Sequence, residues 1–204
     1  SLINLNAENI ASTSLDDSNQ YSIKSMTLEG NRTDSTTTGT SRAIDCPAPA
    51  WIMSTQYSAA IIATDIEING FTGDGIFLGS NRNWGLFTNV IVRYCNDNAI
   101  AMYSVDNRFV SCDFGVCKNY GARCYAGGAN SFTGCNLYYN KINFVANTSV
   151  GAPCWFVNCC FDGSTEHGVY LDDSSSIDSY SFISCRFQGN SSSFANTYSD
   201  IYTK

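Results

Sequence analysis

The sequence predicts an all-β protein, a single-stranded right-handed parallel β-helix of about eight rungs, in which each rung is one coil of the chain. Three observations predict this fold. Short segments alternate apolar and variable residues, they recur at intervals that are mostly 22–26 residues long, and turn-forming Gly, Asn, Asp and Ser separate them. A repeat of this length is typical of a solenoid.

The first strand of each rung is marked by three residues of which the first and third are apolar. These segments begin at positions 3, 26, 66, 90, 112, 135, 159 and 185, so the intervals are 23, 40, 24, 22, 23, 24 and 26 residues. The first and third residues of a strand point to the same face, and we expect both to point into the core. The first positions are Ile3, Met26, Ile66, Val90, Cys112, Cys135, Cys159 and Cys185. The third positions are Leu5, Leu28, Ile68, Val92, Phe114, Leu137, Phe161 and Phe187.

Phe stands three positions before five of the three-residue segments, at residues 87, 109, 132, 156 and 182.

A second strand follows the first in each rung. About ten residues after several of the segments a second apolar run appears, for example at 75–78, 99–102 and 168–171. Each strand then pairs with its copy one rung along, roughly 4.8 Å away. Parallel strands joined by crossovers are right-handed in almost all proteins, which predicts the hand.

The long interval of 40 residues predicts one inserted loop, at about 31–60. At 204 residues the chain has the length of one domain, so we expect a single β-helix over residues 1–204. Solenoids need caps at their ends, and neither end of this sequence offers one. We therefore expect the sequence to be an excerpt of a longer chain.

Composition restricts the partners. The net charge is −7 and no basic stripe is present, which disfavours nucleic acid as a ligand. No apolar run approaches the length of a membrane span, so we expect no membrane partner. The chain has ten cysteines and one His. Because Cys112, Cys135, Cys159 and Cys185 share one inward position, we expect stacked free thiols rather than disulfides. Since the sequence has no paired CxxC and a single His, we expect no metal, and we expect no cofactor.

The Phe-x-x-Cys-x-Phe rungs at 109–114, 156–161 and 182–187, with the Asn and Gly turns after them, carry a family resemblance. The chain resembles pectate-lyase-like right-handed parallel β-helices and, more narrowly, the central domain of bacteriophage tailspikes. The resemblance implies a homotrimer in the tail of the virion, made in the cytoplasm of a bacterial host. It also implies binding, and often cleavage, of the surface polysaccharide of that host.

The sequence departs from the catalytic motifs of related enzymes. Asp172 and Asp173 lack the Gly-His-Gly and Arg-x-Lys companions of polygalacturonase-like proteins, and Glu166, His167 and Gly168 precede them instead. No acidic cluster with a nearby Arg corresponds to the calcium site of pectate lyases. Neither activity is carried over to this chain.

Two outward carboxylates are the candidate catalytic pair. Glu67 and Asp113 are predicted to lie in one column of the sheet that the first strands of the rungs form, two rungs apart, so their backbones lie roughly 9.6 Å apart. Inverting glycosidases hold two carboxyl groups roughly 6.5–9.5 Å apart, which leaves room for a water molecule. This spacing predicts a glycoside hydrolase that degrades polysaccharide.

Four further residues are candidate substrate ligands. Arg93 and Tyr138 are predicted to flank the carboxylates, where Arg can hold an anionic sugar and Tyr can stack on a ring or donate a proton. Trp84 is a candidate for stacking on sugar. An alternative reaction is elimination, as in a secreted polysaccharide lyase, with Tyr138 as proton donor and Arg93 and Asn69 neutralising a uronate. A non-catalytic stalk or carbohydrate-binding module is the other alternative, since this fold also serves as inert scaffold.

Overall fold

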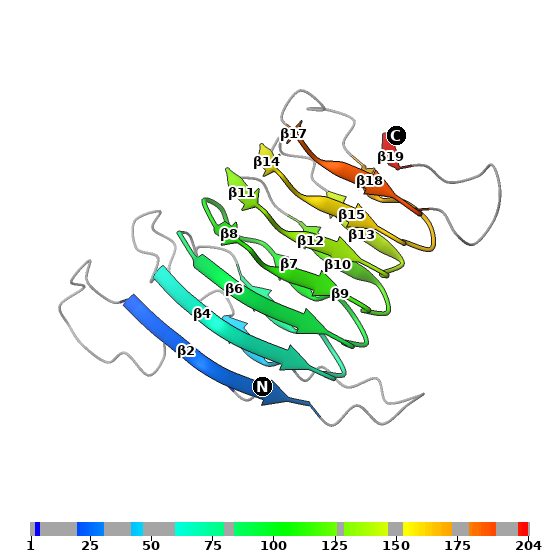
Figure 1. The fold of residues 1–204 in the computed structure, drawn as a ribbon. Helices are drawn as coiled ribbons and strands as arrows, with labels where there is room; N and C mark the ends of the chain where they lie inside the picture. The colour runs from blue at the N-terminus through cyan, green and yellow to red at the C-terminus, as the bar shows by residue number, and fades with distance from the viewer. Residues whose placement is uncertain are drawn as a thin grey trace.

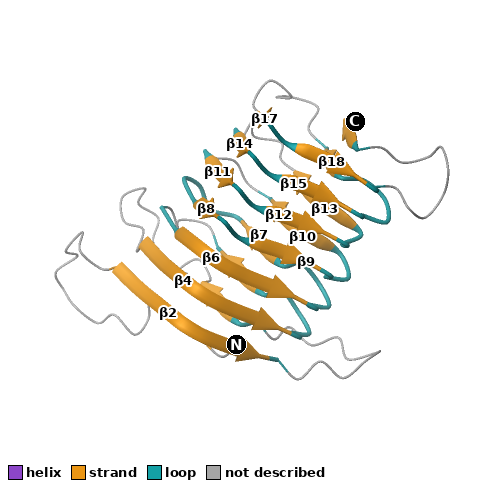
Figure 2. Cartoon of the chain, in the orientation of Figure 1, coloured by secondary structure: helices purple, strands orange, loops and turns teal. Residues whose placement is uncertain are grey.

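The computed structural model describes residues 3–4, 20–30, 42–46, 60–79, 84–125, 129–146, 153–172, 180–190 and 200–203. These residues form β-strands, turns and loops, and Figure 2 shows no helix among them. Neighbouring strands are parallel throughout, and the chain coils so that successive rungs lie side by side along one axis (Figure 1). The described part of the chain is a parallel β-helix, as the sequence predicts.

Short strands form the first sheet, with one strand from each successive coil. Their order in the sheet is their order in the chain. The eight strands are β1 (Ile3–Asn4), β3 (Ile44–Cys46), β5 (Ile76–Leu78), β7 (Ile100–Met102), β10 (Tyr120–Cys124), β13 (Ile142–Ala146), β16 (Val169–Leu171) and β19 (Ile201–Thr203).

The second sheet begins with long strands and continues with pairs of short ones. The long strands are β2 (Gln20–Glu29), β4 (Ala60–Asn69) and β6 (Leu86–Arg93). The pairs are β8 (Arg108–Val110) with β9 (Asp113–Gly115), β11 (Asn130–Thr133) with β12 (Asn136–Tyr138), β14 (Cys154–Val157) with β15 (Cys160–Asp162), and β17 (Tyr180–Ile183) with β18 (Arg186–Gln188). Both β8 and β9 pair with β6, so each short pair is one bent strand.

A left-handed residue accounts for the bend. In seven coils the residue just before the inward three-residue segment has φ between 51° and 63°. These residues are Ser25, Asp65, Asn89, Ser111, Gly134, Asn158 and Ser184. A single residue in this region turns the chain without ending the coil, and Gly, Asn, Asp and Ser adopt it at the smallest cost. The turn formers in the sequence therefore stand where the strands bend.

The strand register confirms the predicted inward column over seven coils. Leu28 pairs with Ile68, which pairs with Val92, and the column continues through Phe114, Leu137, Phe161 and Phe187. The prediction is wrong at the first segment. Ile3 pairs with Ile44 of β3 in the other sheet and does not stack on Met26. The second sheet therefore has seven layers within the described residues, not eight, and Leu5 lies outside those residues.

The predicted insertion at 31–60 is also corrected. Residues 42–46 within it are part of the β-helix, because β3 lies between β1 and β5 in the first sheet. The sequence pattern Ile44-Asp45-Cys46 is a rung strand that the long interval concealed. Residues 31–41 and 47–59 lie outside the described residues.

The core is a column of stacked rings beside a column of thiols. The five predicted Phe residues stack with centroid separations of 4.9, 4.6, 4.8 and 5.0 Å along the coils. The thiols of Cys112, Cys135, Cys159 and Cys185 each donate a hydrogen bond to the carbonyl of the Phe in the preceding coil, at 3.4 Å. All nine cysteines with described side chains are free, as predicted. Within the described residues, no helix is long and apolar enough to span a membrane.

Candidate functional site

The two candidate carboxylates lie in one outward column of the second sheet. Glu67 pairs with Ile91, and Ile91 pairs with Asp113. The predicted two-coil separation is therefore present, which places the two backbones about 9.6 Å apart. Both side chains are partly exposed on the outer face. Ile91 lies between them, so the two carboxylates belong to separate sets of contacts.

The first set of contacts surrounds Asp113. Arg93 ends β6, and its Nε donates a hydrogen bond to the Tyr138 hydroxyl at 2.7 Å. A terminal nitrogen of the same guanidinium lies 3.7 Å from Asp113 Oδ2. The other carboxylate oxygen of Asp113 accepts a hydrogen bond from Asn136 Nδ2 at 2.7 Å. Arg93, Asp113, Asn136 and Tyr138, from three successive coils, thus form one contact cluster, which we call the Arg93 cluster.

Gly115 makes the Arg93 cluster possible. It lies between Arg93 and Tyr138 in the strand register. A Cβ atom at Gly115 would lie 2.4 Å from Cζ of Tyr138, so the ring lies directly over this glycine. The absence of a side chain at 115 therefore lets the tyrosine reach an arginine two coils away.

Burial keeps the Tyr138 hydroxyl protonated to a higher pH than that of an ordinary tyrosine. The ring is half-buried, and loss of solvent raises the pKa of Tyr138 above its ordinary value, while the Arg93 guanidinium acts in the opposite direction. The hydroxyl is therefore neutral at pH 7. It can donate a proton but does not act as a phenolate base.

The second set of contacts surrounds Glu67. Asn69 Nδ2 donates to Glu67 Oε1 at 3.1 Å and to Glu29 Oε1 at 3.0 Å. The Oδ1 atom of Asn69 is buried and has no hydrogen-bond partner. Asn69 thus holds two carboxylates of adjacent coils together, next to Arg93 in its own column.

Trp84 is not brought to this face. It precedes β6, and 66% of its surface is exposed. Arg93 is the last residue of the same strand, so the indole and the guanidinium lie at opposite ends of β6. The structure therefore brings together Arg93, Asp113 and Tyr138, and separately Glu67 and Asn69, but it leaves Trp84 apart.

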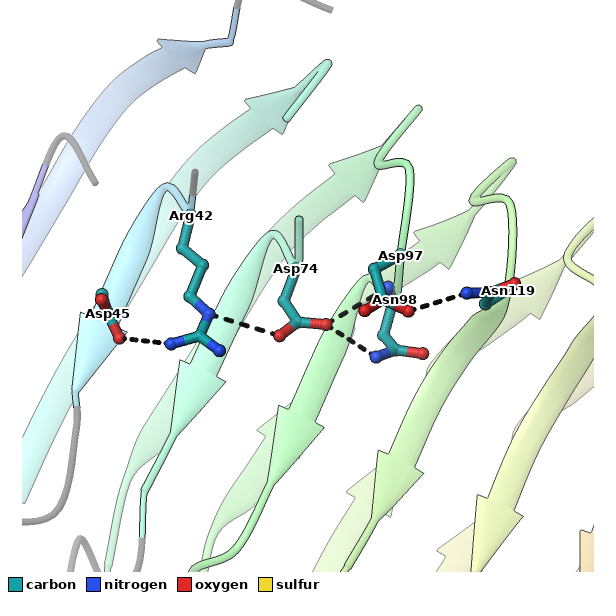
Figure 3. A network of polar contacts seen from close by, with 6 residues as sticks. All are labelled: Arg42, Asp45, Asp74, Asp97, Asn98 and Asn119. Carbon is teal, nitrogen blue, oxygen red and sulfur yellow. Dashed lines mark hydrogen bonds and ion pairs between the residues drawn. The ribbon is translucent and has the colours of Figure 1, made fainter. Parts of the chain in front are cut away.

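Sequence reasoning missed Asn136 and Gly115, although the repeat contains a signal for the first. Asn136 lies one coil after Asp113, and the same amide-to-carboxylate contact recurs between other adjacent coils. Gln188 donates to Asp162 at 2.9 Å, and Asn89 donates to Asp65 at 2.7 Å. At another corner of the coil, Asn98 donates to Asp74 at 2.6 Å and Asn119 donates to Asp97 at 2.8 Å (Figure 3). An Asn or Gln one period after an acid therefore predicts this pairing.

Comparisons with family models, with curated proteins and with solved structures give no match to this chain. The assignment of a parallel β-helix accordingly depends on the strand register, and the narrower resemblance to tailspikes stays a prediction. Within the described residues, no group of three or more His, Cys, Asp or Glu side chains is placed to hold a metal ion.

Proposed function

We propose that the outer face of the second sheet binds a bacterial surface polysaccharide and hydrolyses its glycosidic bonds. In this proposal the chain is a host-recognition protein of the tailspike type. We propose its trimeric state and its place in a virion tail from the resemblance of the rungs to those of tailspikes.

One observation carries the proposal. Glu67 and Asp113 occupy one outward column two coils apart, a backbone separation of about 9.6 Å, near the carboxyl spacing of inverting glycosidases. We assign the base to Asp113, because Arg93 and Asn136 hold both of its oxygens in place. We assign the acid to Glu67, which has no cation within ion-pair distance among the described residues. Asp113 then activates water, while Glu67 protonates the leaving oxygen.

A second candidate reaction is elimination at a uronate. The hydrogen bond between Arg93 and Tyr138 favours it, because it places a neutral hydroxyl beside a cation. The guanidinium would neutralise the uronate carboxylate, the Asp113 carboxylate would take the proton from C5, and the Tyr138 hydroxyl would protonate the leaving oxygen as the C4–O bond breaks.

Product analysis on purified capsule or O-antigen polysaccharide distinguishes these reactions. Hydrolysis produces new reducing ends, whereas elimination produces the absorbance of an unsaturated uronate. For hydrolysis we expect Glu67→Gln and Asp113→Asn each to lower kcat by roughly 10²–10⁴-fold, the usual contribution of a general acid or base. For elimination we expect Tyr138→Phe to remove the activity.

Asp162→Asn is the matched control. Asp162 lies on the same sheet and accepts a hydrogen bond from Gln188 in the way that Asp113 accepts one from Asn136. We expect this variant to keep full activity. Polysaccharide that binds without any product would show a binding module, and full activity in both Glu67→Gln and Asp113→Asn would remove the proposed pair.

A further inference from the structure

A stack of aromatic rings runs along the outer face of the first sheet, far from the carboxylates on the second. Phe77, in β5, lies 5.6 Å from Tyr103 between ring centroids, and Tyr103 lies 4.2 Å from Tyr125 with nearly parallel rings. A guanidinium covers each end of the stack. Arg42 lies 3.7 Å from the centroid of Phe77, and Arg123 lies 4.1 Å from that of Tyr125.

The two guanidinium groups differ in their partners. Arg42 lies 3.0 Å from a carboxylate oxygen of Asp45 and 3.4 Å from one of Asp74 (Figure 3). Arg123 has no ion pair with any described residue, although the chain has 18 acidic residues against 11 basic ones. Its Nε is buried and has no hydrogen-bond partner. The Arg42 end of the stack is therefore neutralised by Asp45 and Asp74, whereas no described carboxylate neutralises the Arg123 end.

The buried Nε of Arg123, which has no hydrogen-bond partner, lowers the stability of the folded protein. A buried donor without a partner costs free energy, and the cost is larger for a charged group. The contacts of Arg123 are otherwise with rings, since its Cζ also lies 5.1 Å from the centroid of Tyr120. Rings attract the cation over their faces but leave the in-plane N–H groups unsatisfied.

The surroundings of Arg123 hold it in one place. It occupies an outward position of β10 between Ala101 of β7 and Val145 of β13. Both neighbours are buried and apolar, so the Arg123 side chain leaves the sheet between apolar residues. Arg123 is partly exposed as a residue, and among its described nitrogens Nε is the one that is buried without a partner, so the two terminal nitrogens form the outer edge of the group. That edge presents two parallel N–H groups, which match the two oxygens of a carboxylate.

We propose that Arg123, held by the rings of Tyr120 and Tyr125, binds the carboxylate group of a small organic acid at the outer face of the first sheet. The ligand supplies the negative charge that Asp45 and Asp74 supply to Arg42. Holding the guanidinium against the rings before binding lowers the entropy lost on association. The site is independent of Glu67 and Asp113, which lie on the other sheet.

Titration followed by NMR tests this site. Sodium acetate and sodium D-glucuronate are added to the protein at constant ionic strength and pH 7, and the Nε–Hε signal of Arg123 is followed. We expect a saturable shift of this signal with both acids, and no comparable shift with glucose. We expect Arg123→Lys to bind glucuronate about tenfold more weakly, because an ammonium loses the paired N–H geometry.

Arg108→Lys is the matched control, since Arg108 is an exposed arginine on the second sheet, and it should bind both acids as the unmodified chain does. An Arg123 signal that does not move at saturating acetate would overturn the proposal, and this measurement does not depend on any variant folding. Equal affinity in Arg123→Lys would overturn it too. Sulfate binding as tightly as acetate would contradict the assignment of the ligand as a carboxylate.

Discussion

Single residues decide which side chains meet on the outer faces. On the second sheet, Gly115 leaves space for the Tyr138 ring, and the ring then reaches Arg93 across the coil between them. On the first sheet, Arg42 contacts two carboxylates, whereas Arg123 lies against two rings and forms no ion pair with a described residue. The contact of Tyr138 with Arg93 and the difference between the partners of Arg42 and Arg123 each depend on one or two neighbouring residues rather than on the coil as a whole.

Gly115→Ala should displace the Tyr138 ring. A Cβ atom at this position meets ring carbons at 2.4–2.7 Å, and because the ring is at the surface it can swing away. We expect the hydrogen bond to Arg93 to be lost, at a cost of about 1 kcal/mol in the free energy of unfolding. The exposed ring should then titrate with a pKa closer to the ordinary value of tyrosine. Urea denaturation and ultraviolet difference titration measure the two effects.

The Tyr138→Phe variant identifies which part of the ultraviolet titration belongs to Tyr138, because that part is missing from its titration curve. If Gly115→Ala leaves the raised pKa of Tyr138 unchanged, the ring does not depend on the space above Gly115.

At the scale of the element, six of the seven coils turn at two left-handed positions. The second of these lies four residues after the first residue of the inward segment and is occupied by Gly70, Tyr94, Val116, Tyr139, Gly163 and Gly189, with φ between 53° and 71°. Glycine adopts this conformation without cost, but a β-branched residue such as Val116 does not. The backbone at this position therefore has the same left-handed conformation in residues that adopt it without cost and in residues that it strains.

Val116→Gly should stabilise the protein. Val116 has φ of 55°, and relief of this strain outweighs the entropy that glycine adds to the unfolded chain, so we expect a gain of about 1 kcal/mol in the free energy of unfolding. Val110→Gly is the control, because Val110 lies within β8 and not among the left-handed residues. There we expect a loss of about 1 kcal/mol. Equal losses in both variants, measured by urea denaturation, would show that Val116 is not strained.

At the scale of the whole molecule, the stacked core makes stability depend on keeping its thiols protonated. The hydrogen bond with Cys112, together with burial, raises the pKa of Cys135 to about 12 from an ordinary value of 9.0. The hydrogen bond with Cys135 and burial likewise raise the pKa of Cys159. In the unfolded chain these two thiols lose their protons at lower pH than in the folded protein. The hydrogen bond with Cys135 lowers the pKa of Cys112, which opposes part of this effect.

The free energy of unfolding should therefore be pH-dependent in alkaline solution. Between about pH 9 and pH 12 the folded protein binds protons that the unfolded chain has released, so its stability is complete below pH 9 and falls as the pH rises. Tyr125, whose pKa burial raises to about 12, contributes in the same direction above pH 10. Urea midpoints measured from pH 7 to pH 10.5 in the presence of a reductant test this.

Cys135→Ala should show a shallower loss of stability over this range, and Cys160→Ala, which changes a partly exposed thiol, should behave as the unmodified chain does. A midpoint that does not change with pH would contradict the buried thiol column. At pH 7 the reductant itself should leave the midpoint unchanged, because the described cysteines are free.

The repeat in the sequence predicted the inward column from Leu28 to Phe187 and the column of cysteines, and it showed Phe at one repeat position in five coils, although the stacking of those rings comes from the structure. It also predicted that Glu67 and Asp113 share an outward column. It did not assign Ile3 to its sheet, and it concealed Ile44–Cys46 within an apparent insertion. Three alternating residues have the same pattern in either sheet, so periodicity alone does not decide which strand they pair with.

The sequence by itself determined the fold class and the register of the coil, because burial of one face at a fixed period leaves few other arrangements. Only the tertiary structure decided which outward side chains touch. The contact of Tyr138 over Gly115 with Arg93, and the absence of an ion pair between Arg123 and any described carboxylate, depend on which way long side chains turn between neighbouring coils. The period of the sequence fixes the columns, but it does not fix the rotamers within them.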